Sequence, residues 1–221
     1  MSAQIILNFH GLGDPPAYVD DAERPYWISA ELFDELVSRT SARADIAYSF
    51  DDGNLSDLTI AAPTLQRFGR VGEFFILTGR LDRDGYLLPE HLQELRDMGM
   101  EIGLHGRDHV DWRSLDDKGL DEETIGARQV LSAALGRTIE SVSIPFGAYN
   151  RRVVRHLMRC GYSAIYTSDG GTAPTGARIK SRTSIRSDMS RARLDEVVGG
   201  RSSASVGAKR ALSTFLRRHI L

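Results

Sequence analysis

Residues 45–53 read DIAYSFDDG, an apolar segment that ends in two adjacent aspartates and a glycine. The apolar part, which includes Ile46 and Tyr48, predicts a buried strand. Asp51 and Asp52 therefore stand at the carboxyl end of that strand. Two neighbouring carboxylates repel each other unless a partner neutralises one of them. The plainest interpretation is a strand-to-turn junction, since Asp-Gly is a common turn pair. The other motifs of the chain decide between this interpretation and a functional one.

Similar apolar segments recur along the chain and alternate with amphipathic segments. Glycine commonly ends a helix, and four predicted helices stop at such a residue, namely Gly69, Gly99, Gly136 and Gly161. Ser29, Asp121 and Asn150 are predicted helix N-caps. The predicted strands cover residues 4–9, 45–50, 71–77, 100–104, 139–144 and 162–167.

This alternation of strands and helices predicts an α/β fold with a parallel sheet covered by helices. Six strands within about 170 residues suit either a barrel or a doubly wound sheet. Residues 187–221 are rich in arginine and serine, and we expect a helical C-terminal extension there. Residues 1–186 are the predicted domain.

The composition excludes several classes of protein. The 221 residues are 41% hydrophobic and 26% charged, as in an ordinary globular domain. A net charge of −2 gives no sign of nucleic-acid binding. One cysteine rules out an internal disulfide framework, and no segment reaches the roughly 20 apolar residues of a membrane span. No signal peptide is recognised at the start of the chain, so we expect a cytoplasmic protein.

Polar residues gather just past the predicted strands. His10 follows residues 4–9, and His105 follows residues 100–104. The sequence Pro-Phe-Gly at 145–147 follows another strand. In parallel α/β folds this edge of the sheet is where sites are built. A purely structural turn at Asp51 and Asp52 would not predict such convergence.

His105 and His109 are four residues apart, which brings both imidazoles to one side of a helical turn or tight loop. Two imidazoles and one carboxylate form a common set for a catalytic metal. One aspartate could then bind the ion while the other stays ionised as a base. Successive residues leaving a strand point in different directions, which permits this division.

These motifs resemble those of the polysaccharide deacetylases, carbohydrate esterase family 4, also called the NodB-homology domain. The first family motif, [T/S]-F-D-D-G, matches residues 49–53, and the second, H-[S/T]-x-x-H, matches residues 105–109 with Gly106 in the hydroxyl position. The third ends in R-x-P-[Y/F]-G, of which residues 145–147 keep P-F-G. The resemblance covers roughly residues 1–185.

The resemblance implies a distorted (β/α)7 barrel that removes N-acetyl, less often O-acetyl, groups from a sugar. It implies Asp51 as catalytic base and Asp52, His105 and His109 as ligands of one divalent ion. Zinc is the first choice for that ion. Cobalt and nickel are alternatives, because this ligand set suits several metals.

The first departure from the family pattern concerns the general acid. The family has an L-x-H motif near its C-terminus, whereas this tail has only His219 in an arginine-rich segment. His10 ends the predicted first strand, as in the circularly permuted branch that includes poly-N-acetylglucosamine deacetylases. We therefore assign the acid role to His10, with a buried structural histidine as the alternative. Its pKa would have to be raised above about 6.5, which nearby carboxylates favour and a metal opposes.

The second departure is Ser143, where many members carry an arginine that orients the base. Arg182 can supply that guanidinium from elsewhere, and an exposed surface arginine is the alternative. Gly106 removes a side-chain hydrogen bond from the metal loop, and we expect metal binding to survive this change.

The expected substrate is an acetylated sugar or oligosaccharide, and no nucleic acid. The predicted substrate-binding residues are Pro145, Phe146, Gly147 and Tyr149, with Trp112 as a further aromatic. His91 and His156 are predicted to be surface groups, and Cys160 is predicted to be part of the core. Two alternatives stay open: an amidase acting on a non-sugar C–N bond, and a non-catalytic glycan-binding relative.

Overall fold

The computed structural model describes residues 3–200, 214 and 217. Its described strands are β1 (Ala3–Phe9), β2 (Ile46–Asp51), β3 (Gly72–Leu77), β4 (Glu101–Gly106), β5 (Ser141–Ser143), β6 (Ala164–Thr167), β7 (Thr172–Pro174), β8 (Ile179–Ser181) and β9 (Thr183–Ser184). Every strand predicted from the sequence is present. The shift in bounds at β5 is the largest, since only the middle of residues 139–144 pairs with its neighbours.

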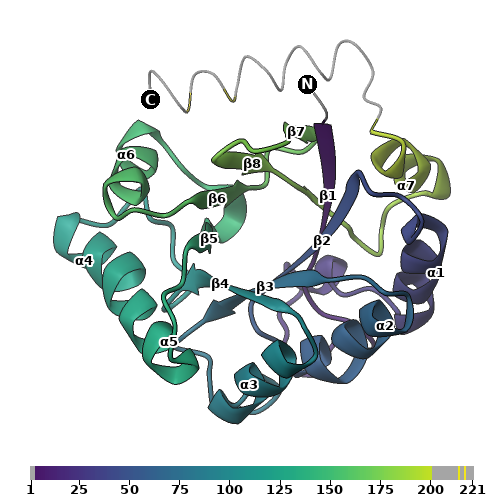
Figure 1. Ribbon diagram of the computed structural model, residues 1–221, viewed down its shortest axis with the longest axis horizontal. Helices are drawn as coiled ribbons and strands as arrows, with labels where there is room; N and C mark the ends of the chain where they lie inside the picture. The colour runs from purple at the N-terminus through teal and green to yellow at the C-terminus, as the bar shows by residue number, and fades with distance from the viewer. Residues whose placement is uncertain (1–2, 201–213, 215–216, 218–221) are drawn as a thin grey trace.

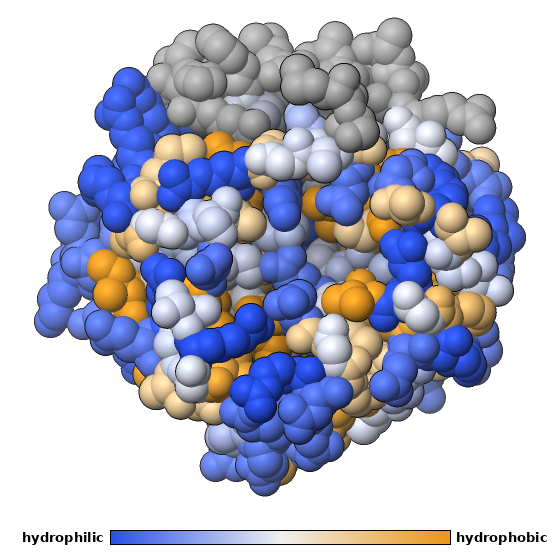
Figure 2. All heavy atoms as spheres, viewed as in Figure 1, coloured by the Kyte–Doolittle hydropathy of each residue, from blue (hydrophilic) through white to orange (hydrophobic). Residues whose placement is uncertain are grey.

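The helices lie outside the ring of strands (Figure 1). They are α1 (Ala30–Thr40), α2 (Ala62–Arg67), α3 (Pro89–Asp97), α4 (Asp117–Asp121), α5 (Ala127–Leu135), α6 (Arg151–Arg159) and α7 (Arg191–Val198). Short 3-10 turns are η1 (Arg24–Tyr26) and η4 (Pro145–Gly147), and π-helical turns are η2 (Asp57–Ala61) and η3 (Glu122–Gly126). Figure 2 shows mainly hydrophilic residues over the outer surface of this helical layer.

Helix caps follow the sequence signals with one exception. Ser29 accepts a hydrogen bond from the N–H of Leu32, and Asn150 caps α6 in the same way. The predicted cap Asp121 is wrong, because Asp116 precedes α4 and accepts from the N–H of Gly119 at 2.7 Å. Two acidic residues in one segment compete for the cap position, and the pattern alone does not rank them.

The described strands form one sheet in the order β7-β1-β2-β3-β4-β5-β6-β8, and β9 also pairs with β1. All neighbours are parallel except β7 on β1. β8 pairs with β6, whereas the following β9 pairs with β1. The single segment 179–184 therefore closes the sheet into a nearly complete barrel. This confirms the predicted distorted (β/α)7 barrel.

The two faces of each strand enter different cores. Side chains such as Leu7, Tyr48 and Phe74 belong to the large cluster between the strands and the helices. Ile6, Phe75 and Tyr166 form a small separate cluster. Strands buried on both faces explain the continuous apolar runs in the sequence.

Residues 191–198 form α7 within the predicted C-terminal extension. Its residue Asp195 pairs with Arg39 of α1, and Leu194 is buried against the main core. The remaining extension, including His219 and all but two residues after Gly200, lies outside the described residues. None of the helices in residues 3–200 combines the length and apolar character that crossing a bilayer requires.

Candidate metal centre and active site

The polar residues that follow the strands line a common cavity. Asp51 ends β2, His105 is in β4, and His10 directly follows β1. These three, with Asp52, His109 and Phe146, border one cavity of about 310 Å³. The prediction that these groups meet at the carboxyl edge of the sheet therefore agrees with the structure.

Asp52, His105 and His109 are arranged as a metal centre would require. Asp52 Oδ1 lies 3.5 Å from Nε2 of His105 and 3.6 Å from Nε2 of His109. The three ligand atoms all lie within 4.8 Å of one another. Oδ1 of Asp52 is buried and has no hydrogen-bond partner among the described residues. An ionised oxygen buried without a partner is costly, so this donor set fits a divalent cation.

The backbone aims the two aspartates in different directions. Asp52 has a φ of 82° and Gly53 a φ of 70°, both in the left-handed region. This region costs a non-glycine residue roughly 1–3 kcal/mol, and such strain clusters at functional sites. The turn directs Asp52 toward the histidines, whereas Asp51 faces Arg182. The backbone thus separates the two carboxylates, as the expected division of their roles would require.

Each histidine is prepared to bind a cation. Nδ1 of His105 lies 2.9 Å from the carbonyl oxygen of Ser143. Because a carbonyl only accepts, Nδ1 carries the proton and Nε2 is left free. Burial lowers the pKa of His109 to about 4, against the opposing effect of the Asp52 carboxylate. His109 is therefore neutral near pH 7, which is the form that binds metals.

Asp51 is held by a buried arginine. Arg182 donates to Oδ1 and Oδ2 of Asp51 over 2.8 Å each, and Asn8 donates to Oδ2 over 3.0 Å. Burial alone would raise the pKa of Asp51, but Arg182 and neighbouring groups hold it below its usual range. Asp51 is therefore ionised, and it is not among the three clustered ligand groups.

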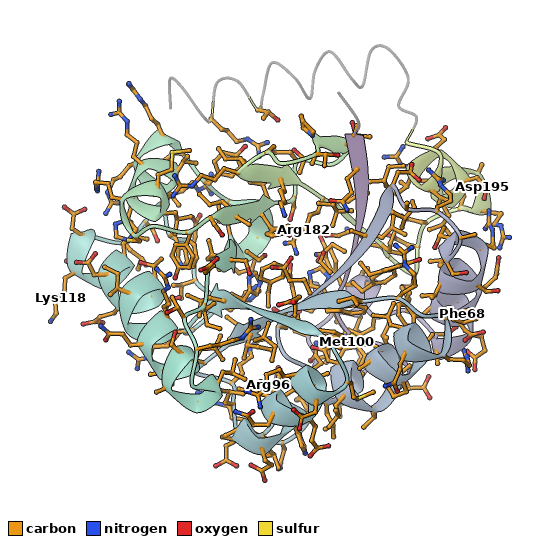
Figure 3. The ribbon with its side chains drawn as sticks, in the orientation of Figure 1. Phe68, Arg96, Met100, Lys118, Arg182 and Asp195 are labelled. Atoms are coloured by element: carbon orange, nitrogen blue, oxygen red, sulfur yellow. The ribbon has the colours of Figure 1, made fainter. Side chains whose placement is uncertain are left out.

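Arg182 lies inside the barrel, as Figure 3 shows, and is fully buried. The alternative of a surface arginine is therefore wrong. Its guanidinium contacts the rings of Phe75 and Tyr166 at 5.2 and 5.6 Å. It also donates to the hydroxyl of Ser143 over 2.5 Å. Ser143 stands where the family motif has its arginine. In this chain Ser143 instead accepts a hydrogen bond from Arg182, which comes from segment 179–184.

His10 borders the cavity beside Tyr26, with ring centroids 4.8 Å apart. Its buried Nδ1 has no hydrogen-bond partner among the described residues, which argues against a purely structural histidine. Burial lowers the pKa of His10, although the Asp52 and Asp51 carboxylates act to raise it. The expectation of a raised pKa is wrong for the metal-free protein, because desolvation outweighs the carboxylates.

The metal loop is held by Glu123, a residue that the sequence did not reveal. Its carboxylate accepts from the N–H groups of Arg107 and Asp108 and from the indole of Trp112, over 2.9–3.2 Å. Gly106 has a φ of 96°, and a Cβ there would lie 2.6 Å from Glu123 Oε2. Glu123 thus supports the loop next to the position where the family motif has a hydroxyl. It lies 17 residues beyond Gly106, so no local spacing indicates the contact.

The predicted substrate residues divide into two groups. Phe146 is 62% exposed, and its ring lies 4.2 Å from that of His109. Pro145 and Gly147 are buried in the turn η4 that presents it. Tyr149 does not border the cavity, since it is 1% exposed and its hydroxyl donates to Asp169 over 2.6 Å. Trp112 is likewise fully buried. Of the three predicted aromatic residues, Phe146 is therefore the one that borders the cavity.

Several residues that border the cavity were missed from the sequence. Glu23, Tyr26 and Trp27 come from the connection between β1 and α1, and Arg80 and Tyr86 come from that between β3 and α3. The run Arg-Pro-Tyr-Trp at 24–27 was the available signal, because aromatic residues in a connection at this edge have little other reason to be there.

The predicted surface position of His156 is wrong. His156 is 7% exposed, and its Nε2 lies 2.7 Å from Thr124 Oγ1 and 3.3 Å from Cys160 Sγ. Cys160 is partly buried and packs against the main core. Four of the nine residues of α6 are arginines, so the sequence gives little sign that His156 shares the buried face with Val153 and Leu157.

The sequence profile of the polysaccharide deacetylase family matches residues 38–165. This segment contains Asp51, Asp52, His105, His109 and Phe146, whereas His10 and Arg182 lie outside it. YxkH of Bacillus subtilis, which is named after the same family, is 23% identical over 128 residues. That match spans 58% of this chain and 46% of YxkH, so the chain corresponds to less than half of that relative.

Solved structures share the fold. A polysaccharide deacetylase from Bacillus cereus superposes with a TM-score of 0.77 at 16% identity, over 89% of this chain and 69% of that one. The deacetylase PplD of Streptococcus pyogenes gives 0.73 at 19% identity, over 89% and 98%. IcaB from Ammonifex degensii gives 0.71 at 20% identity, over 90% and 96%. With the family profile covering more than half of the chain, this protein belongs to the polysaccharide deacetylase family.

Proposed function

We propose that this protein is a metal-dependent hydrolase that removes N-acetyl groups from a glycan or glycan precursor containing N-acetylhexosamine. One observation carries the proposal. Two adjacent carboxylates are separated in role, since Asp51 is paired with Arg182 while Asp52 lies with His105 and His109. One carboxylate that a metal ion can neutralise, next to a second that stays ionised as a base, suits hydrolysis assisted by a metal.

Asp52, His105 and His109 would hold the ion. When bound, a divalent cation supplies Lewis acidity, which polarises a carbonyl group and lowers the pKa of water. Zinc suits two imidazoles and one carboxylate, and cobalt and nickel suit them as well. The hydrogen bond from His105 to Ser143 and the loop contacts of Glu123 keep the ligands in place.

Asp51 would act as the general base. Arg182 fixes both of its oxygens and keeps it ionised, so it can take a proton from water as the water attacks the acetyl carbonyl. Its pKa, held below the usual range, makes it a weak base in the metal-free protein. Arg182 is therefore a positioning residue, which secures the geometry of Asp51 at some cost in basicity.

His10 would donate a proton to the leaving amine from the end of β1. It borders the same cavity as Asp51, and its buried Nδ1 has no hydrogen-bond partner among the described residues. The backbone N–H groups around Phe146, whose ring lies beside that of His109, are candidates for stabilising the oxyanion.

The rival functions make different predictions. An amidase for a non-sugar substrate would have the same metal chemistry but would not release acetate from N-acetylhexosamines. A non-catalytic glycan-binding relative would have lost groups from the site, whereas this chain retains the base, the ligand set and a candidate acid.

An acetate-release screen tests the proposal. The substrates are N-acetylglucosamine oligomers, lipid-linked sugars, nucleotide sugars and O-acetylated sugars, with bound metal measured in the same samples. We expect acetate release that requires the metal and is lost, together with the metal, in a His105→Ala, His109→Ala double variant. No acetate from any N-acetylated sugar by metal-loaded protein would refute the proposal.

A further inference from the structure

The long connection between β1 and α1 folds into a wall beside the metal centre. Its two ends are joined by hydrogen bonds from Gly13 to Ile28 and from Ile28 to Gly11. The ring of Trp27 packs directly on Gly11, where a Cβ atom would lie 2.0 Å from the ring. This glycine permits the close approach that keeps the connection folded against the barrel.

The connection between β3 and α3 forms the neighbouring part of the wall. The N–H of Leu87 donates to the carbonyl of Gly53, and the N–H of Leu55 donates to that of Gly85, each over 2.9 Å. These bonds tie the connection to the turn that follows Asp52. It is thus anchored directly to the loop that carries the metal ligand.

The two connections meet across one side of the cavity. Arg80 Nη2 lies 3.8 Å from Glu23 Oε1, and the rings of Tyr18 and Tyr86 have centroids 5.7 Å apart. A Cβ on Gly85 would lie 1.9 Å from the hydroxyl oxygen of Tyr18, so the contact is tight. Glu23 Oε1 is also 4.0 Å from His109 Nδ1, so this contact between the two connections lies next to the metal centre.

Another part of the cavity border is more exposed. There Phe146 is 62% exposed beside His109, and Ser168 and Ser184 provide small polar side chains. Along the cavity border, Glu23 and Arg80 are thus in contact with each other, whereas Phe146 projects toward solvent. Its volume of about 310 Å³ is at the low end of the roughly 300–1,000 Å³ of ligand pockets.

We propose that the site takes a single N-acetylhexosamine unit, either free or at the end of a chain, and excludes the interior units of a polymer. This inference rests on the proposed deacetylase function. An interior unit needs room for a neighbouring sugar on both sides of the reacting one, and the contacts of Glu23 with Arg80 and Tyr18 with Tyr86 occupy one of those sides. Tyr86 and Phe146 provide aromatic faces for the ring, and Glu23 and Arg80 provide hydrogen-bonding groups for its hydroxyls.

The position of the amine product tests this inference. Full-length, metal-loaded protein is incubated with N-acetylglucosamine oligomers of one to six units whose reducing end carries ¹⁸O, and fragment mass spectrometry locates the free amine. We expect the amine at a terminal unit, with a rate per molecule that changes less than about threefold with chain length. Interior units deacetylated at rates comparable with the ends would overturn the inference and leave the deacetylase function standing. Absence of acetate from every oligomer and from the free sugar would overturn the inference, and the deacetylase function falls as well when the lipid-linked and nucleotide sugars also give no acetate.

A variant tests whether the wall is the cause. Tyr18→Ala removes the contact with Tyr86 and changes no residue that borders the cavity. We expect interior products to increase at least severalfold, whereas the control Val130→Ala, an exposed apolar residue on α5, keeps the terminal pattern. Circular dichroism and thermal melting verify that the variant is folded. A folded Tyr18→Ala protein with an unchanged product pattern would show that the contact between the two connections does not exclude interior units.

Discussion

Arg182 and Asp51 are 131 positions apart in the chain, yet the guanidinium donates to both carboxylate oxygens over 2.8 Å. The contact exists because segment 179–184 closes the barrel between β6 and β1. Both groups are almost fully buried, so each depends on the other for neutralisation. The pair therefore connects closure of the fold to the position of Asp51, the proposed base.

Replacing Arg182 should damage both stability and activity. Arg182→Ala leaves a buried carboxylate unpaired, which costs about 3–5 kcal/mol of unfolding free energy. Arg182→Lys keeps the charge but loses the two parallel hydrogen bonds, so we expect partial recovery of stability and little recovery of the rate. Urea unfolding and acetate release measure the two effects. The control Arg193→Ala breaks an exposed pair with Glu196 and should cost at most about 1 kcal/mol; an equal cost in both variants would contradict this account.

Glu123 should matter for the metal although it is not a ligand. Glu123→Ala removes the acceptor for two loop N–H groups and one indole N–H. Replacing a residue that holds metal ligands in place without binding the metal typically lowers metal affinity about 10–100-fold, and we expect a loss of this size. Glu123→Gln should recover part of this loss, since its carbonyl still accepts. Chelator competition measures the dissociation constant, with Glu122→Ala as the neighbouring exposed control, and an unchanged constant in Glu123→Ala would show that the loop does not need this carboxylate.

His10→Ala should lose more rate on amides than on activated acetate esters. An amine leaving group needs a proton, whereas a good ester leaving group does not. Because burial lowers the pKa of His10, kcat/KM of the parent protein should begin to fall with rising pH below pH 6.5, and this limb should flatten in the variant. Stopped assays over pH 5–9 with both substrate types measure it. Equal losses on amide and ester would assign His10 to positioning, and a selective loss in His219→Ala would move the acid to the C-terminal tail.

The metal-free protein should lose stability as the pH falls from about 6.5 to 4. His109 has a pKa of about 4 in the folded state because burial disfavours its charged form, whereas an unfolded histidine titrates near 6.5. Between these values the unfolded chain binds more protons, so acid favours unfolding. The contribution is on the order of 3 kcal/mol. Urea unfolding of the metal-free protein at several pH values measures this slope, which should decrease in His109→Gln; an identical slope in that variant would exclude His109 as the source.

Local patterns were sufficient to predict a parallel α/β sheet and the groups at its edge, whereas the choice of a barrel came from the family resemblance. Asp51, Asp52 and His105 each follow an apolar run, and parallel strands bring their carboxyl ends together regardless of the connections. Other parts of the site depend on long-range packing. Arg182 reaches Asp51 only through the closing segment, and nothing in its neighbouring residues specifies the barrel interior.

The direction in which side chains point was the second feature that the sequence did not predict. Phe146 and Tyr149 are three residues apart beside the same turn, but Phe146 has a φ of 58° and points to the cavity rim while Tyr149 is buried. A positive φ in a phenylalanine is rare, and the sequence gives no warning of it. The wall from Tyr18 to Trp27 was missed for a related reason, because its position depends on contacts with Gly11 and Arg80 that only the folded chain creates.

The division of labour between Asp51 and Asp52 is the central claim, and one paired measurement tests it most directly. Asp51→Asn and Asp52→Asn proteins are compared for bound metal by elemental analysis and for acetate release at equal metal loading. We predict that Asp51→Asn keeps stoichiometric metal and loses about 10²–10⁴-fold in rate, whereas Asp52→Asn loses most of its metal. Near-normal turnover in Asp51→Asn, or full metal content in Asp52→Asn, would contradict the account.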